Sequence, residues 1–466
     1  MEFPAQIASA NHSTHTAAEN LQASLAGQGA LRHSTQQPFA AHGQSPLSKQ
    51  QQIREAVLLS FCDPRPRECA KLQGLSSRQW KPLLHWLDIS GLALYFLERI
   101  TELEISEELP ITVLARLRKN LEDNTVRTDA MIAEAASIQQ EFQDAGLSYV
   151  MMKGFSLWPI SVPRLELRSQ LDLDFLIANS SANQARSILE ARGYHLRAIS
   201  GRSWELKTKA AGVSSIKDLY KMKPQRTVEL HLERPGPVNE SRLARAEQRL
   251  FRGARMPVLA PADLFLGQGM HLFKHICGPS FRTAHLLEFR RHVRARHHED
   301  RFWTELRQLA ERDTRVPLGL GVVILLISQV IGDFAPEALT SWTVDTLPAE
   351  IRLWVQLYGR KVVFYNSSGS KLYLLLQQEL EKVGIAAKRS LGQELIPRQL
   401  PRVIWQRTLG EKPQESVRRY YKQLNYVGMR VRFHIIEGLR YLRESARWKR
   451  RIKLLPLAEQ HTSRVV

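Results

Sequence analysis

Two aspartates stand two positions apart in an otherwise apolar run, Leu171-Asp-Leu-Asp-Phe-Leu-Ile177. Alternation of this kind is typical of a β-strand, in which residues i and i+2 project from the same face. Asp172 and Asp174 would therefore lie side by side, and repulsion between their charges would raise the pKa of one of them. A divalent cation held between the carboxylates removes this repulsion, and hard ions such as Mg²⁺ prefer carboxylate oxygens. The alternative is a solvated strand edge without chemistry.

A basic turn precedes the acidic pair. The apolar run 149–152 predicts a second strand, which stops at Lys153-Gly154. Glycine lets the backbone approach a phosphate closely, and the N–H groups of the turn that follows can point at an anion. Lys153 and Arg168 could neutralise phosphate charge, and arginine can do so through two hydrogen bonds. Ser156 could add a hydroxyl contact, whereas both cations could instead be ordinary surface residues.

A third acid is expected from a neighbouring strand. Residues 226–232 alternate, so that Glu229 and His231 share one face and apolar residues share the other. Glu229 is the candidate for the third carboxylate, although the sequence does not determine its register against Asp172. His231 could contact a metal ion, a phosphate or an acceptor. A buried and hydrogen-bonded structural histidine is the alternative for His231.

In order along the chain, Lys153-Gly154, Arg168 and Asp172-Leu-Asp174 resemble the KG…R…DxDxL signature of the uncharacterised bacterial-type nucleotidyltransferase family, within the DNA polymerase β-like superfamily. Residues 228–231, Val-Glu-Leu-His, are similar to the V-(D/E)-L-H strand of that family. The resemblance extends over residues 80–291, less than half of the chain. Phe155 follows Gly154 where the wider superfamily usually has serine, so the phosphate loop departs from the superfamily pattern.

The resemblance implies transfer of a nucleoside monophosphate from an NTP, with ATP as the expected donor, to a hydroxyl acceptor that it does not identify. Two ions of Mg²⁺ or Mn²⁺ commonly hold the reacting oxygens in such a transfer. The implied catalytic metal ligands are Asp172, Asp174 and Glu229. The implied nucleotide contacts are Lys153, Gly154, Ser156, Arg168 and His231. Two other classes of protein remain open: a catalytically inactive nucleotide-binding or regulatory module, and a basic RNA- or partner-binding protein.

Two further histidines share a helix face. His271 and His275 are four residues apart in a helix predicted over 262–277, which makes half of a metal site. A zinc hydrolase helix of the HExxH type would carry glutamate where Leu272 stands, so zinc-dependent hydrolysis is excluded. We expect this pair to pack or to support the nucleotide site. The family often places an acid after such a helix, and Glu288 is the candidate.

Composition predicts a globular protein with two or three domains. The chain has 466 residues, of which 43% are hydrophobic and 24% charged. The apolar run 318–331 is too short to cross a bilayer and predicts a buried helix, so no transmembrane segment is expected. Three cysteines without a CxxC pair predict neither a disulfide framework nor a zinc site. A cytoplasmic location is expected, because the N-terminus lacks the pattern of a secretory signal.

The net charge of +20 favours polyanionic partners. Part of this charge lies in a predicted helical tail, since residues 417–453 hold twelve lysines and arginines against Glu437 and Glu444. Six aromatic residues alternate with these cations: Tyr420, Tyr421, Tyr426, Phe433, Tyr441 and Trp448. Cations and aromatics together suit single-stranded nucleic acid, although the helical spacing also fits a packing stripe. RNA, an acidic membrane surface and the acidic groove of a partner remain open.

An α+β fold follows from the order of the elements. Strands predicted at 149–152, 171–177, 194–199, 204–209 and 226–232, with helices among them, make a nucleotidyltransferase-type mixed sheet embedded between helical regions. The expected segments are a disordered leader (1–50), a helical N-terminal region (51–145), the nucleotidyltransferase-like core (146–260), a helical C-terminal domain (261–410) and the basic tail (411–466).

Overall fold

The computed structural model describes most of the chain. The described residues are 47–209, 218–222, 225–236, 240–279, 281–365, 369–386, 389–396 and 413–462. The leader predicted for residues 1–50 lies outside them except for its last four residues. The helix α2 (Lys49–Leu59) begins two residues before the predicted start of the helical region at residue 51. The Ser48 hydroxyl caps this helix by accepting a hydrogen bond from the backbone N–H of Gln51.

A seven-stranded mixed sheet confirms the predicted α+β class. In spatial order its strands are β3 (Tyr194–Ser200), β4 (Ser203–Thr208), β5 (Thr227–Leu232), β2 (Leu173–Ile177), β1 (Tyr149–Met152), β7 (Ala254–Val258) and β6 (Glu247–Phe251). The β6–β7 hairpin is not among the predicted strands, because charged residues along β6 and Pro257 in β7 conceal the alternation. Its two-residue turn, Arg252-Gly253, has φ values of 46° and 89°, as a type I′ hairpin requires.

The strand that carries the acidic pair starts later than predicted. β2 begins at Leu173, so Asp172 lies just before the strand, and Leu171, the first residue of the predicted strand, is 40% exposed. β2 pairs in antiparallel fashion with β1, where Met152 faces Asp174. It pairs in parallel fashion with β5, where Asp174 stands opposite Glu229. The register that the sequence left undetermined therefore aligns Glu229 with the second aspartate and not with the first.

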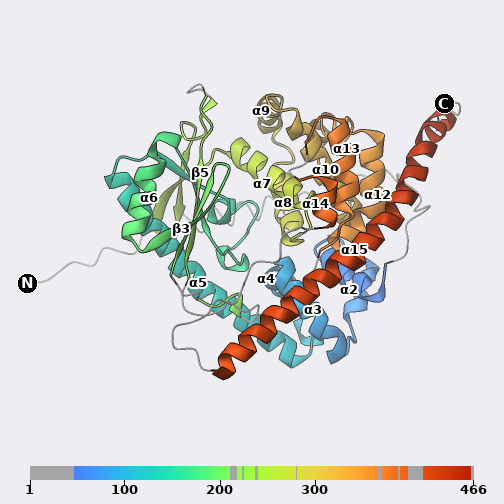
Figure 1. Cartoon of the computed structure of the whole chain (residues 1–466), viewed down its shortest axis with the longest axis horizontal. Helices are drawn as coiled ribbons and strands as arrows, with labels where there is room; N and C mark the ends of the chain where they lie inside the picture. The colour runs from blue at the N-terminus through green and yellow to red at the C-terminus, as the bar shows by residue number, and fades with distance from the viewer. Residues whose placement is uncertain are drawn as a thin grey trace, which may run out of the picture. The chain divides into compact units, whose positions relative to one another are not determined.

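The two faces of the sheet have different surroundings. α5 (Ile111–Asp144) and α6 (Ala182–Ala191) cover one face (Figure 1), where Phe142 of α5 packs edge-on against Phe175 with ring centroids 5.7 Å apart. Because side chains alternate along a strand, Asp174 and Leu176 point to the opposite face. Leu176 there belongs to a smaller cluster that includes Leu264 of α7. The acids thus lie on the face that meets the C-terminal helices.

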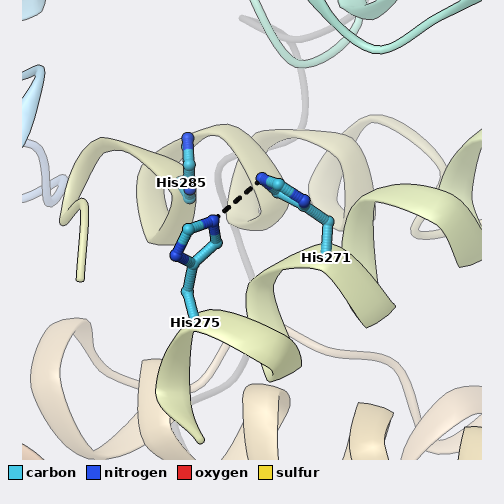
Figure 2. A group of neighbouring side chains, drawn as sticks. All are labelled: His271, His275 and His285. Atoms are coloured by element: carbon cyan, nitrogen blue, oxygen red, sulfur yellow. Dashed lines mark hydrogen bonds between the residues drawn. The ribbon is translucent and has the colours of Figure 1, made fainter. Parts of the chain in front are cut away.

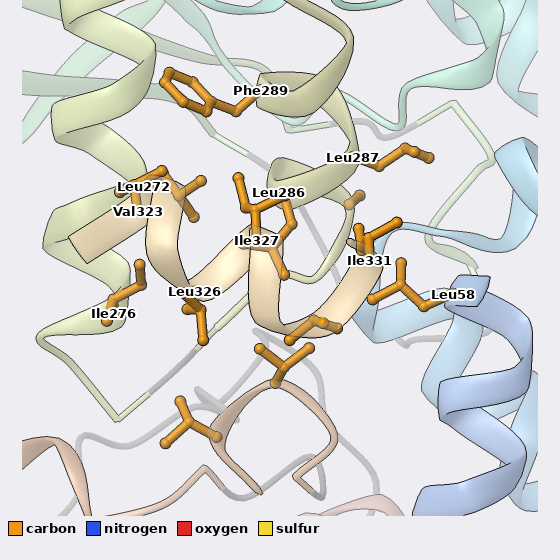
Figure 3. Close-up of a cluster of buried hydrophobic side chains, with 14 of the residues drawn as sticks. Leu58, Leu272, Ile276, Leu286, Leu287, Phe289, Val323, Leu326, Ile327 and Ile331 are labelled. Carbon is orange, nitrogen blue, oxygen red and sulfur yellow. The ribbon is translucent and has the colours of Figure 1, made fainter. Parts of the chain in front are cut away.

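The helices before and after the sheet share one hydrophobic core. Figure 3 shows Leu58 of α2 next to Ile331 of α10, and the same cluster includes Leu287 of α8. Further helices are α3 (Ser77–Ser90), α4 (Ala93–Glu102), α7 (Pro261–Ile276), α8 (Ala284–Ala295), α9 (Asp300–Ala310), α10 (Arg315–Ile331), α11 (Glu337–Thr340), α12 (Ala349–Val363), α13 (Tyr373–Lys382) and α14 (Leu391–Leu395). α10 is the buried helix predicted from residues 318–331. None of the described helices combines the length and apolarity that crossing a bilayer requires.

The basic tail forms one long helix, α15 (Pro413–Thr462), coloured red in Figure 1. One side of it packs on α12 and α13. Phe433, Tyr441 and Trp448 are buried on this side, and the Trp448 indole N–H donates to Glu379 Oε1 at 3.1 Å. These three aromatics are packing residues, as the helical spacing allowed, and are not available for stacking on nucleic acid bases.

Candidate functional site

The turn after β1 requires glycine. Lys153 and Gly154 both have φ of +53°, a left-handed conformation that glycine adopts without steric cost. A Cβ atom on Gly154 would overlap the carboxamide of Gln170. That carboxamide donates to the backbone carbonyl of Asp172 at 2.7 Å, so the close approach fixes the segment that carries Asp172. Ser156 is fully buried and donates its hydroxyl to the Lys153 carbonyl at 2.7 Å, which stabilises the turn from within.

Four predicted residues meet on the face of the sheet opposite α5 and α6. Lys153 Nζ lies 2.9 Å from Asp174 Oδ1, and His231 Nε2 lies 2.8 Å from the same oxygen. His231 Nε2 is also 3.3 Å from Glu229 Oε2. The ligand atoms of Asp174, Glu229 and His231 all lie within 4.8 Å of one another, close enough to surround a single ion.

Asp172 lies beside this group and not within it. It is not one of the three residues whose ligand atoms converge, because it precedes the strand. Burial, followed by the charges of Asp174 and Glu229, raises the pKa of Asp172 to about 6. The three acids are thus close enough to interact electrostatically, and Asp174 and Glu229 are the two whose oxygens converge with His231.

His231 and Lys153 control the ionisation of the inner acids. Burial opposes the charged form of Asp174, but the hydrogen bond from His231 and the charge of Lys153 outweigh it and lower the pKa to about 2. The hydrogen bond to His231 also lowers the pKa of Glu229. Burial lowers the pKa of His231, yet its bonds to both carboxylates outweigh burial and leave the pKa above its ordinary value. Asp174 and Glu229 are consequently ionised at neutral pH.

Arg168 is anchored to the helical domain. Its Nε donates to Glu288 Oε1 of α8 at 3.1 Å, and the Tyr95 hydroxyl donates to the same oxygen at 3.0 Å. The Glu288 side chain is buried, so this is an ion pair largely removed from water. The acid predicted after the paired-histidine helix thus holds Arg168 in place, while Arg168 still acts electrostatically on Asp172 and Asp174.

Sequence reasoning missed two residues that shape the site. Arg127 of α5 is buried and donates to the backbone carbonyls of Gln170 and Leu219, so it holds the segment before Asp172. Gln170 fills the space beside Gly154. Neither belongs to a motif, since a single Arg in a long helix and a single Gln in a loop look like ordinary surface residues in the sequence.

A third histidine joins the predicted pair. Figure 2 shows His285 of α8 facing His271 and His275 of α7, whose Nε2 atoms are 3.1 Å apart. Burial, then the nearby His275, lower the pKa of His271 to about 3, so its imidazole is neutral. The expected sharing of a helix face is confirmed, whereas His285 comes from another helix and could not be found by spacing.

Two of the cavities along α7 differ in the residues that line them. One of about 40 Å³ is lined by residues of the site and of the histidine cluster, among them Lys153, Arg168, His271 and His285. A larger cavity of about 970 Å³ has arginines such as Arg242 and Arg315 among its lining residues. None of the predicted site residues lines the larger cavity. Of the predicted site residues, Lys153 and Arg168 line the smaller cavity, whereas Asp172, Asp174 and Glu229 line neither of the two.

Comparison with known proteins identifies a family for the region that contains the sheet and the predicted site. The model of a family described as uncharacterised nucleotidyltransferase matches residues 76–325, just over half of the chain. A crystal structure of an antigenic nucleotidyltransferase-like protein from Paracoccidioides brasiliensis aligns with 47% of this chain and 98% of its own, at 13% identity and a TM-score of 0.27. No curated protein matches. The matched region extends from α3 to α10 and contains every predicted site residue, and the chain belongs to this nucleotidyltransferase family.

Proposed function

We propose that the protein transfers a nucleoside monophosphate from an NTP, ATP first of all, to a hydroxyl acceptor. The observation that carries the proposal is the alignment of Asp174 with Glu229 on adjacent strands, beside the Lys153-Gly154 turn. In the transfer, an acceptor oxygen forms a bond to the α-phosphorus while the bond to the leaving pyrophosphate breaks. The acceptor proton must leave as this bond forms, and it passes to water or to a carboxylate of the site that holds no metal ion.

The donor set fits the divalent ion that this family implies. Asp174 and Glu229 present oxygens toward one point, and Asp172 adds a third carboxylate nearby, which suits Mg²⁺ or Mn²⁺. Bound ions would supply Lewis-acid stabilisation of the attacking and leaving oxygens. Lys153 is the residue best placed to move from Asp174 to a phosphate, because its side chain is only partly buried. Arg168, which is held by Glu288, contributes a fixed positive charge to the same site.

Incorporation of label from each α-³²P NTP, with Mg²⁺ or Mn²⁺ and with RNA, protein and small hydroxyl compounds as acceptors, tests this function. We expect label with the wild type and none with Asp174→Asn. Glu190→Gln on α6, which alters a partly buried acid of the same domain that pairs with Arg186 of its own helix, should behave as wild type. Tight binding of NTP and metal without transfer to any acceptor would favour the inactive nucleotide-binding module.

We further propose that α15 binds an anionic lipid surface. The packed side of the helix holds both acids of residues 416–455, Glu437 and Glu444, in buried positions, so its open side carries cations without acids. Large aliphatic residues are exposed on that side at helical spacing: Val417, Leu424, Val431, Ile435, Leu439 and Leu442. An apolar stripe bordered by arginines is typical of helices that lie in a membrane interface. The exposed residues are mainly aliphatic, which favours lipid over base stacking.

Flotation with vesicles tests the lipid proposal. We expect the full chain to float with phosphatidylserine-containing vesicles and not with phosphatidylcholine alone, and Ile435→Glu to reduce the bound fraction by at least about 10-fold. Ile111→Glu, at an exposed apolar position on α5, is the matched control and should bind normally. Salt-sensitive binding to single-stranded RNA, unaffected by Ile435→Glu and without flotation, would assign the surface to nucleic acid instead.

A further inference from the structure

Three imidazoles converge where α7 meets α8. The ligand nitrogens of His271, His275 and His285 lie within 4.8 Å of one another (Figure 2), and the ring centroids are 4.6 to 5.5 Å apart. Around a tetrahedral Zn²⁺ with Zn–N bonds of about 2.0–2.1 Å, neighbouring nitrogens would be about 3.3–3.4 Å apart. The 3.1 Å between the Nε2 atoms of His271 and His275 is close to that spacing.

The cluster contains a buried polar atom without a partner. His285 is 8% exposed, and its Nδ1 has no hydrogen-bond partner among the described residues. Buried polar atoms are nearly always satisfied, so an unsatisfied one calls for a ligand or a water molecule. The helix spacing brings His271 and His275 together, but an apolar residue at 285 would have closed this junction without leaving a nitrogen unsatisfied.

We propose that His271, His275 and His285 together bind one transition-metal ion, Zn²⁺ being the best match, with the fourth coordination position open. Neutral imidazole nitrogens prefer Zn²⁺ over Mg²⁺, whereas the carboxylates of Asp174 and Glu229 have the opposite preference. The chain would therefore hold two metal sites of different chemistry. This proposal does not depend on the transfer reaction.

The surrounding charge specifies the fourth ligand. Arg168 and Arg282 act electrostatically on His285, and Lys153 acts on His271. Glu288 pairs with Arg168 and also acts on Arg282, and Asp174 acts on His271, so these acids offset part of the positive charge. A dication in this positive field gains from an anionic ligand, such as hydroxide or a phosphate oxygen. The adjoining cavity of about 40 Å³ is large enough for one small ligand beside the ion, and it is also lined by Lys153.

The ion would join α7 to α8 close to the Lys153-Gly154 turn, because Lys153 lines the same small cavity as His271 and His285. α7 supplies two of its ligands and α8 the third, and α8 also carries Glu288, which holds Arg168. Metal binding would thus fix the helix that positions a cation of the proposed transfer site. This arrangement assigns the histidines a positioning role toward that site, and hydrolysis is not implied.

Co²⁺ and Zn²⁺ binding to the full chain tests the site. After chelator treatment, we expect one equivalent of Co²⁺ to give the visible absorption of a tetrahedral ion, and Zn²⁺ to displace it. His285→Ala and His271→Ala should weaken this binding by at least about 100-fold. Circular dichroism in the absence of metal checks that the variants fold. His285→Cys, which restores a ligand, should recover Zn²⁺ binding and add a sulfur-to-cobalt charge-transfer band even if the alanine variants fail to fold.

Two controls separate this site from other ligands. His195→Ala alters an exposed histidine on β3, and Asp174→Asn alters the carboxylate site; both should keep the tetrahedral Co²⁺ signal. Residues 1–50 contain four histidines that could also take up metal. A Co²⁺ signal that persists in His285→Ala and is unchanged by His285→Cys would overturn the proposal, as would the absence of any such signal in the wild type.

Discussion

Asp174 stands directly opposite Glu229 in the parallel pairing of β2 and β5, and the two carboxylates are bridged by a single imidazole nitrogen. That nitrogen, His231 Nε2, is 2.8 Å from Asp174 Oδ1 and 3.3 Å from Glu229 Oε2. Two acids on adjacent strands would repel each other without such a group. His231 therefore stabilises, in the absence of metal, the same oxygens that we propose to hold Mg²⁺ or Mn²⁺.

Metal binding should compete with protonation of His231. The pKa of His231 is raised above its ordinary value, so at mildly acidic pH its positive charge opposes a cation between Asp174 and Glu229. Mn²⁺ affinity, measured by electron paramagnetic resonance, should rise with pH as His231 loses its proton. The Mn²⁺ affinity of His231→Gln should depend less on pH, and the dependence that remains should come from the titration of Asp172. An unchanged pH dependence in His231→Gln would exclude His231 as the competing group.

Asp172→Asn should stabilise the metal-free protein. The pKa of Asp172 is raised to about 6 in the folded state, above the ordinary value of 3.8, so its ionisation on folding costs stability. This cost is absent at pH values below the pKa that Asp172 has in the unfolded chain, and it is fully present above its pKa in the folded protein. Asp172→Asn should therefore raise the free energy of unfolding by about 1–3 kcal/mol at pH 7–8. The gain should vanish below about pH 4. Urea denaturation across this pH range measures it.

A matched surface acid is available for this comparison. Asp144→Asn, at the exposed C-terminal end of α5, should leave the free energy of unfolding nearly unchanged over the same range. Added Mn²⁺ should stabilise the wild type more than Asp172→Asn, since the carboxylate then gains a cation. A loss of stability in Asp172→Asn at neutral pH would show that the aspartate is a structural residue.

Gly154→Ala should disrupt the Lys153-Gly154 turn. The new Cβ atom would displace the Gln170 carboxamide and break its hydrogen bond to the Asp172 carbonyl, in addition to the cost of a positive φ. We expect a loss of about 2–4 kcal/mol in the free energy of unfolding and weaker NTP binding. Gly201→Ala isolates the backbone cost, because Gly201 has φ of +60° and no atom within 4 Å of the added Cβ. Equal losses in both variants would contradict the steric argument.

Variants of the buried ion pair between Arg168 and Glu288 distinguish a structural role of Arg168 from a role in nucleotide binding. Arg168→Met leaves the Glu288 carboxylate buried without its cation, which should cost about 3–5 kcal/mol in thermal or urea unfolding. Arg168→Met/Glu288→Gln should recover most of that stability, because the charge is removed together with its partner. If Arg168 also serves the nucleotide, NTP binding should remain weak in the double variant. Full recovery of NTP binding would limit Arg168 to a structural role.

The sequence by itself determined the local features of this protein. Alternation identified β2 and β5, because a strand with two different faces repeats every two residues, and a short apolar run identified β1. The order of Lys153-Gly154, Asp172-Leu-Asp174 and Glu229 indicated the family that the comparison confirmed. Spacing of four residues placed His271 and His275 on one helix face. These signals are encoded within a few residues, so they survive without knowledge of the fold.

Tertiary structure decided which of those residues meet. Strand register joined Glu229 to Asp174 and left Asp172 outside the converging group, and helix packing brought His285 to the pair on α7. It also buried Phe433, Tyr441 and Trp448 of α15 while leaving the aliphatic stripe open. Contacts between residues far apart in the chain depend on register and on the packing of whole elements. A one-residue change in register reverses the face on which each side chain lies, and periodicity in a single segment does not record that choice.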